Sequence, residues 1–226
     1  MKKYLVSPLF TPILFSLIWL SAMCYVFAFQ YDNLPLLLSE KGILEQLTNF
    51  AYIPLLIAYI FSAQFFLKNK NHQIDFIVFV LLGISLFLRE LGIQHWLTTH
   101  DTTAFKSRFF LNPNNPLSEK IVAGVILLAF FGLVVYLAVK YTKHLVLSFF
   151  QMNPTTWSIA TLCTIGVLGK IFDRFPSNYK RSHGFPLPEQ LRQHINIIEE
   201  TSEILLPLIA AFILFQYLLI NKRTTN

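Results

Sequence analysis

The stretch KIVAGVILLAFFGLVVYLAVKY, residues 120–141, carries a lysine near each end and no other charged side chain. A helix needs about 20 mostly apolar residues to cross the hydrocarbon core of a bilayer, because each residue advances it by only about 1.5 Å. A helix on the surface of a soluble protein keeps one polar face, and this stretch has none. The stretch therefore predicts a transmembrane helix.

The rest of the chain has the same character. Of its 226 residues 54% are hydrophobic, only 13% are charged, and 23 are phenylalanine, which is more apolar surface than one soluble core of this size would bury. We predict an all-α fold, a polytopic integral membrane bundle of about six transmembrane helices that forms a single membrane domain over residues 1–226. The predicted spans are residues 8–29, 49–68, 75–93, 120–141, 155–173 and 203–220.

Lysine and arginine near the ends of the spans predict the orientation. On a serpentine of six helices, one side of the membrane receives Lys2, Lys3, the segment KNKNH at 68–72, Lys140, Lys143, Lys222 and Arg223. By the positive-inside rule this side is cytoplasmic, so both termini are predicted to be cytoplasmic. The run 8–29 is longer than the apolar core of a signal peptide, so we expect a retained helix. Short loops favour the inner membrane of a bacterial cell.

Ionisable side chains gather at the opposite, outward ends of the helices. They occur in FLRELGIQHWLTTHDTTAFKSRFF (87–110), in GKIFDRFPS (169–177) and in INIIEETSEILLPLI (195–209). Arginine and lysine bind phosphate groups through charge-assisted hydrogen bonds, and arginine can do so with two parallel bonds. The predicted substrate-binding residues are Arg89, Lys106, Arg108, Lys120, Lys170 and Arg174.

Acids and histidines at the same face are candidates for proton transfer. Histidine exchanges protons near neutral pH, and a carboxyl group in apolar surroundings can also carry one. The predicted catalytic residues are Glu200, His95, Glu90 and Glu203. Arg89 and Glu203 lie deepest within apolar runs and are the first candidates for a buried ion pair, with Glu199 and Glu90 as alternative partners.

The long segment RFPSNYKRSHGFPLPEQLRQHINIIEE, residues 174–200, is predicted to be broken by Pro176, Gly184, Pro186 and Pro188. Beyond Pro188 the apolar residues recur at helical spacing, so we expect a helix that continues into the sixth span.

Several other kinds of site are disfavoured. His95, His100 and Asp101 are close in sequence, but an i,i+5 spacing does not place both histidines on one helical face, so no metal site is predicted. Cys24 and Cys163 lie inside predicted spans without Cys-x-x-Cys spacing, which favours small core residues over a redox pair. The net charge of +6 is spread over loops on both sides, so nucleic acid is not an expected partner. No cofactor is indicated.

Two functions fit these observations. The leading hypothesis is recognition, with modification as a further step, of an anionic lipid or envelope substrate at the outward, periplasmic face. The alternative is a non-catalytic membrane scaffold subunit that docks a partner membrane or envelope protein through its charged belt. A belt of purely structural salt bridges also satisfies the same spacings. The motifs of phosphatidic-acid phosphatases, of proteases acting on prenylated ends and of alkaline ceramidases are absent.

Overall fold

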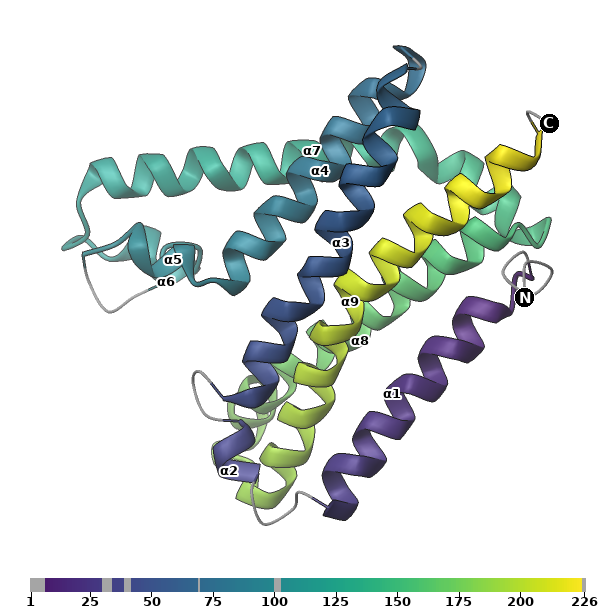
Figure 1. Ribbon diagram of the computed structural model, residues 1–226. Helices are drawn as coiled ribbons and strands as arrows, with labels where there is room; N and C mark the ends of the chain where they lie inside the picture. Colours follow the sequence, from purple (N-terminus) through teal and green to yellow (C-terminus); the bar gives the residue numbers. More distant parts are fainter. Residues whose placement is uncertain (1–6, 30–33, 39–41, 69, 100–102, 225–226) are drawn as a thin grey trace. The chain divides into compact units, whose positions relative to one another are not determined.

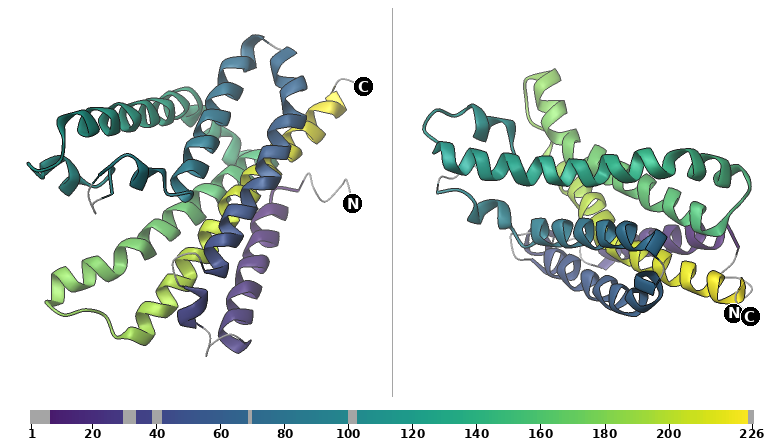
Figure 2. Two further views of the ribbon diagram at one scale, coloured as in Figure 1. Left: turned by 60° about the vertical axis from the view of Figure 1, so that its left-hand side comes forward. Right: turned by 90° about the horizontal axis from the view of Figure 1, so that it is seen from above.

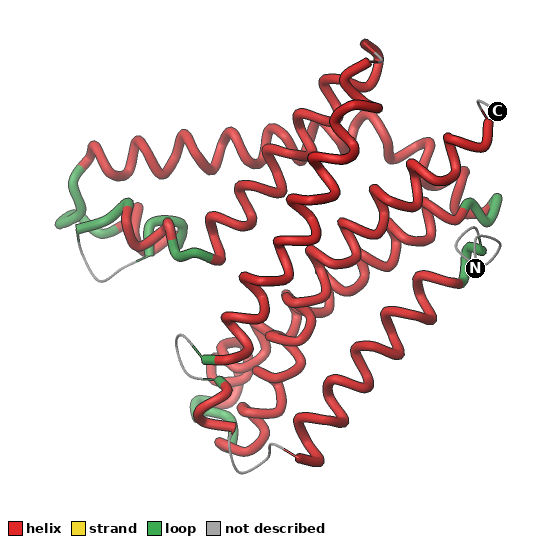
Figure 3. Tube along the Cα trace, in the orientation of Figure 1, coloured by secondary structure: helices red, strands yellow, loops and turns green. Residues whose placement is uncertain are grey.

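The computed structural model describes residues 7–29, 34–38, 42–68, 70–99 and 103–224, and within these ranges every regular element is an α-helix (Figures 1 and 3). Six helices are long and apolar enough to cross a membrane, which confirms the predicted fold class. They are α1 (Phe10–Phe29), α3 (Ile43–Lys68), α4 (Lys70–Glu90), α7 (Leu117–Phe150), α8 (Pro154–His183) and α9 (Glu189–Thr224). Three short helices join them: α2 (Leu34–Leu37), α5 (Ile93–Trp96) and α6 (Ser107–Leu111).

Apolar side chains cover the outside of these helices. Phe61 on α3 is 72% exposed, and Leu128 and Val139 on α7 are 75% and 81% exposed. Such surfaces would associate in water, whereas lipid tails solvate them. The exposure pattern therefore agrees with a multi-pass membrane protein.

The chain divides into two compact units. The first unit comprises Met1–Phe65 and Leu147–Asn226, and the second comprises Phe66–Val146. A single membrane domain stays a prediction.

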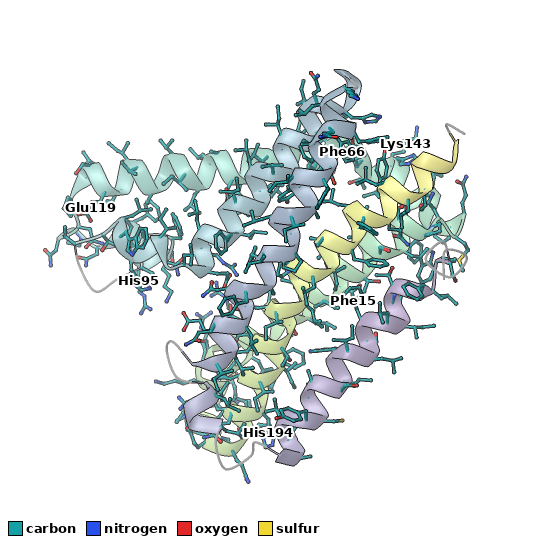
Figure 4. The ribbon with its side chains drawn as sticks, in the orientation of Figure 1. Phe15, Phe66, His95, Glu119, Lys143 and His194 are labelled. Atoms are coloured by element: carbon teal, nitrogen blue, oxygen red, sulfur yellow. The ribbon has the colours of Figure 1, made fainter. Side chains whose placement is uncertain are left out.

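The first unit is built around α1, α8 and α9, which pack against one another. Phe15, Ile165, Leu205 and Ile209 form its main core cluster, with Phe15 marked in Figure 4. A Cβ placed on Gly169 of α8 would lie 3.3 Å from the Cβ of Ser202 on α9. Close approach over small residues is a common mode of helix association in membranes, where lipid gives helices no hydrophobic reason to associate.

A second core cluster ties α2 and the start of α3 to α1 and α9. It contains Val26, Leu34, Leu37, Leu44 and Ile197. Next to it, the imidazole of His194 stacks on the ring of Phe27 with centroids 4.9 Å apart, and Figure 4 shows His194 at this end of α9. This histidine therefore has a packing role.

Three buried polar side chains connect the helices at the other end of the first unit. The hydroxyl of Ser158 on α8 lies 2.6 Å from that of Thr11 on α1 and donates to Oε1 of Gln216 on α9 at 2.7 Å. All three side chains are buried. The start of α1 and the last turns of α9 thus lie at the same end of this unit (Figure 1).

The segment after the fifth span differs from the prediction at Pro176. Pro176 lies inside α8, which continues to His183 and ends at Gly184 in the left-handed conformation with φ 79°. A proline removes only one helical hydrogen bond, which the surrounding turns of a long helix can tolerate. The expected continuation of the next helix is confirmed, because α9 runs unbroken from Glu189 to Thr224.

The cysteine prediction was also wrong in part. Cys24 and Cys163 are both free and exposed instead of packed in the core. Each lies on an apolar helix whose outer face suits lipid, where a small apolar side chain is as acceptable as in a core.

Candidate functional site

The second unit carries a folded segment between α4 and α7, which we call the α5–α6 element and define as residues 93–99 and 103–111. Gly92 starts it with a φ of 77°, a left-handed conformation that glycine adopts without strain. The backbone N–H of Ala104 donates to the carbonyl of Gln94 at 3.2 Å and so joins its two halves. The element is therefore a structured segment.

Buried apolar contacts attach this element to α7. Phe109 and Ala104 of the element and Ala123 of α7 are fully buried against one another. The side-chain amide of Asn115 donates to the carbonyl of Phe109 at 2.8 Å. The hydroxyl of Thr99 donates to Glu119 at 2.9 Å, and Figure 4 shows Glu119 and His95 at this end of the unit.

Two of the predicted substrate-binding cations project from the α5–α6 element. Lys106 and Arg108 are exposed, and neither makes an ion pair with another side chain in the described part of the chain. Trp96 and Leu111 of the same element are 75% and 82% exposed. A segment that exposes cations together with an aromatic ring and an aliphatic side chain is typical of a membrane–water interface.

The other four predicted cations contact groups close in sequence. Arg89 donates to Oε1 of its neighbour Glu90 from Nε at 3.0 Å and from Nη2 at 2.5 Å. The ammonium of Lys120 donates to the carbonyl of Asn112 at 2.7 Å and so closes the turn before α7.

On α8, Lys170 pairs with Asp173 in the same helix, and Nε of Arg174 lies 4.0 Å from Asp173. The structure therefore brings Lys170 and Arg174 to one carboxylate, as their i,i+3 and i,i+4 spacing indicates. These contacts are exposed and within one helix, and such pairs contribute little to stability.

The predicted proton-transfer residues occur in both units. His95 is exposed on α5, and Glu90 is half-buried at the end of α4 beside Arg89, both in the second unit. Glu200 and Glu203 are half-buried on α9 in the first unit. The pairing of Arg89 with Glu203 therefore stays a prediction.

No group of three metal-ligating side chains that could hold an ion occurs among the described residues. His100 and Asp101, considered above as ligands, lie outside those residues.

Sequence reasoning missed a polar cluster in the second unit. Asp75 on α4 is 4% exposed, and its carboxylate accepts hydrogen bonds from Tyr136, Lys140 and Tyr141 on α7. The sequence offered one signal: Asp75 is an acid inside a predicted span, in the predicted cytoplasmic half of the membrane, where no other Asp or Glu was expected. A tyrosine four residues before a lysine at the end of the fourth span offered the matching donors.

No family model, curated protein or solved structure matches this chain.

Proposed function

We propose that this protein is a multi-pass protein of a bacterial inner membrane, with both termini in the cytoplasm, that binds anionic lipid headgroups at its outward face. The observation that carries the proposal is the α5–α6 element, which is attached by Phe109 and presents Lys106 and Arg108 without ion-pair partners in the described chain. A phosphate of a lipid or envelope precursor would provide the missing negative charge.

The chemistry of the element supports a headgroup ligand. Arginine and lysine each contribute about 1 kcal/mol when they lie close to an anionic membrane surface. Trp96 and Leu111 are exposed in the same element and suit insertion into the boundary between headgroups and acyl chains. Phe109 lies on α6 together with Leu111, and its side chain packs against α7. The buried and exposed residues of α6 therefore lie on different faces.

Modification of the bound headgroup is a second step of this proposal. His95 lies on the same element and Glu90 at the end of α4, so both belong to the unit that carries Lys106 and Arg108. Either group can transfer a proton if it reaches the bound phosphate. Glu200 and Glu203 remain candidates from the first unit.

The alternative function is docking of a partner protein. It is favoured by the local pairing of Arg89 with Glu90 and of Lys170 with Asp173, because groups neutralised within their own helix need no ligand charge. A docking subunit would use these pairs and the exposed cations as a recognition surface.

The test is a measurement of which lipids bind to the purified full-length protein. Wild type in nanodiscs of mixed phosphatidylglycerol and phosphatidylcholine should retain phosphatidylglycerol on native mass spectrometry. Removal of both charges in the double variant Lys106→Gln, Arg108→Gln should reduce that retention about tenfold or more, since two contacts of about 1 kcal/mol each are lost.

The charge-preserving double variant Lys106→Arg, Arg108→Lys provides the matched control and should leave retention unchanged, because both cations remain in the element. Equal retention in the double variant and in wild type would refute headgroup binding at this element. A partner protein that is lost on charge reversal at Lys106 and Arg108, with an unaltered lipid profile, would establish the docking alternative.

A further inference from the structure

The carboxylate of Asp75 is bound by three donors from one neighbouring helix. Lys140 donates to Oδ1 at 2.6 Å, Tyr136 donates to Oδ1 at 2.9 Å, and Tyr141 donates to Oδ2 at 2.5 Å. The ammonium of Lys140 also donates to the Tyr136 hydroxyl at 3.1 Å. We call these four residues the Asp75 cluster.

Charge and burial are unequally divided within the Asp75 cluster. The side chain of Asp75 is 5% exposed, whereas that of Lys140 is 40% exposed. The ammonium lies 5.4 Å from the ring centroid of Tyr136 and 5.6 Å from that of Tyr141, within reach of cation–π attraction. The carboxylate therefore depends on the lysine for charge balance more than the lysine depends on the carboxylate.

The Asp75 cluster and the α5–α6 element contact opposite parts of α4 and α7. Asp75 is near the start of α4, and Tyr136, Lys140 and Tyr141 are in the second half of α7. From the cluster, α4 and α7 diverge toward the α5–α6 element, which lies between their far ends (Figures 1 and 2). At that end α7 meets the element through Ala123 and Phe109. The direction of α7 relative to α4 therefore affects whether Phe109 can remain packed against Ala123.

We infer that the Asp75 cluster is a positioning clamp for the headgroup-binding element. It fixes α7 against α4 at one end of the second unit so that Phe109 and Ala104 seat against Ala123 at the other end. Lys106 and Arg108 are then held at the membrane interface in a fixed arrangement. This inference rests on the proposed function, because the clamp serves binding only if the α5–α6 element binds headgroups.

The unequal burial predicts an unequal response to substitution. Lys140→Met leaves a buried carboxylate with only two phenol donors and no cation. Asp75→Asn keeps an acceptor for Lys140 and leaves a half-exposed ammonium that water can solvate. The double variant Asp75→Asn, Lys140→Met carries no charge in the cluster and retains hydrogen-bonding groups. The double variant should therefore keep the α5–α6 element packed against α7 better than Lys140→Met alone does.

The experiment uses full-length protein in nanodiscs with Cys24 and Cys163 replaced by alanine and a single probe cysteine, Ala104→Cys. Ala104 is fully buried in the element, so maleimide should label the probe slowly in the parent protein. Lys140→Met should raise the labelling rate about fivefold or more, a size typical of residues coupled in one ion-pair network. The double variant should return the rate to within about twofold of the parent. Lys143→Met is the control and should not change the rate.

Phosphatidylglycerol retention is measured on the same samples. It should fall in Lys140→Met and recover in the double variant. If Lys140→Met does not accumulate, Tyr136→Phe, which removes one donor, should raise labelling by a smaller factor. A parent-like rate in Lys140→Met, or a double variant that labels as fast as Lys140→Met, would overturn the clamp. A labelling change without any change in phosphatidylglycerol retention would uphold the clamp and reject the proposed function instead.

Discussion

Replacement of Gly169 by leucine is expected to force α8 and α9 apart and to lower the stability of the folded protein. Even a methyl group at this position would lie 3.3 Å from the Cβ of Ser202, which is tighter than most Cβ contacts. A leucine must force the two helices apart, at a cost of about 3 kcal/mol or more. Lipid offers the separated helices an equally apolar environment, so hydrophobic burial does not hold them together once close packing is lost.

The measurement is thermal unfolding of the detergent-solubilised protein, followed by fluorescence-detected size-exclusion chromatography. Gly169→Leu should lower the midpoint by roughly 6 °C or more, given about 2–4 °C for each kcal/mol in chains of this size. Gly132→Leu is the matched control, because a Cβ at Gly132 on α7 meets nothing within 4 Å. Equal midpoints for the two variants would show that α8 and α9 do not pack over Gly169.

Replacement of Phe109 by alanine is expected to release the α5–α6 element from α7. Phe109 is fully buried and is the largest of the three fully buried side chains of its cluster. Removal of a buried phenylalanine side chain costs about 3–5 kcal/mol, and here the loss falls on a short segment held by few other buried contacts. The effect should therefore be local opening of the element.

Limited trypsin digestion reports this opening, because Lys106 and Arg108 are the cleavage sites within the element's second half. Phe109→Ala should be cut there at least about tenfold faster than wild type, since cleavage follows the population of the open form. Leu111→Ala, on the same helix but 82% exposed, should be cut at the wild-type rate. Cleavage of both variants at equal rates would contradict anchoring through Phe109.

Hydropathy was sufficient to predict the six membrane helices, because a bilayer of fixed thickness imposes the length of each apolar run. It did not predict where helices end outside the hydrocarbon. The fourth membrane helix, α7, continues to Phe150, and the fifth, α8, continues past Pro176 and ends at Gly184. Helix ends beyond the membrane depend on capping and on turns such as that at Gly184, which hydropathy does not report.

The composition of the site was predictable only in part. The alternation of cations and aromatic residues in FKSRFF predicts an interfacial segment, and Lys106 and Arg108 are exposed, whereas the position of the segment at the membrane interface stays a prediction. The partner of a charge was not predictable, because several acids lie within helical reach of Arg89 and Lys170, and each cation takes a neighbour. The link between Asp75 and α7 was missed, since contacts between distant helices leave no periodic pattern in the sequence.

Accessibility of residue 114 from outside the cell tests headgroup binding at the outward face, because that binding requires the turn between α6 and α7 to lie there. Asn114 is exposed in that turn. In a background without Cys24 and Cys163, an Asn114→Cys variant should react with a membrane-impermeant maleimide, supplied to cells whose inner membrane is intact, and Lys143→Cys should not. Labelling of Lys143→Cys in intact cells, with Asn114→Cys labelled only after the membrane is opened, would invert the topology and contradict headgroup binding at the outward face.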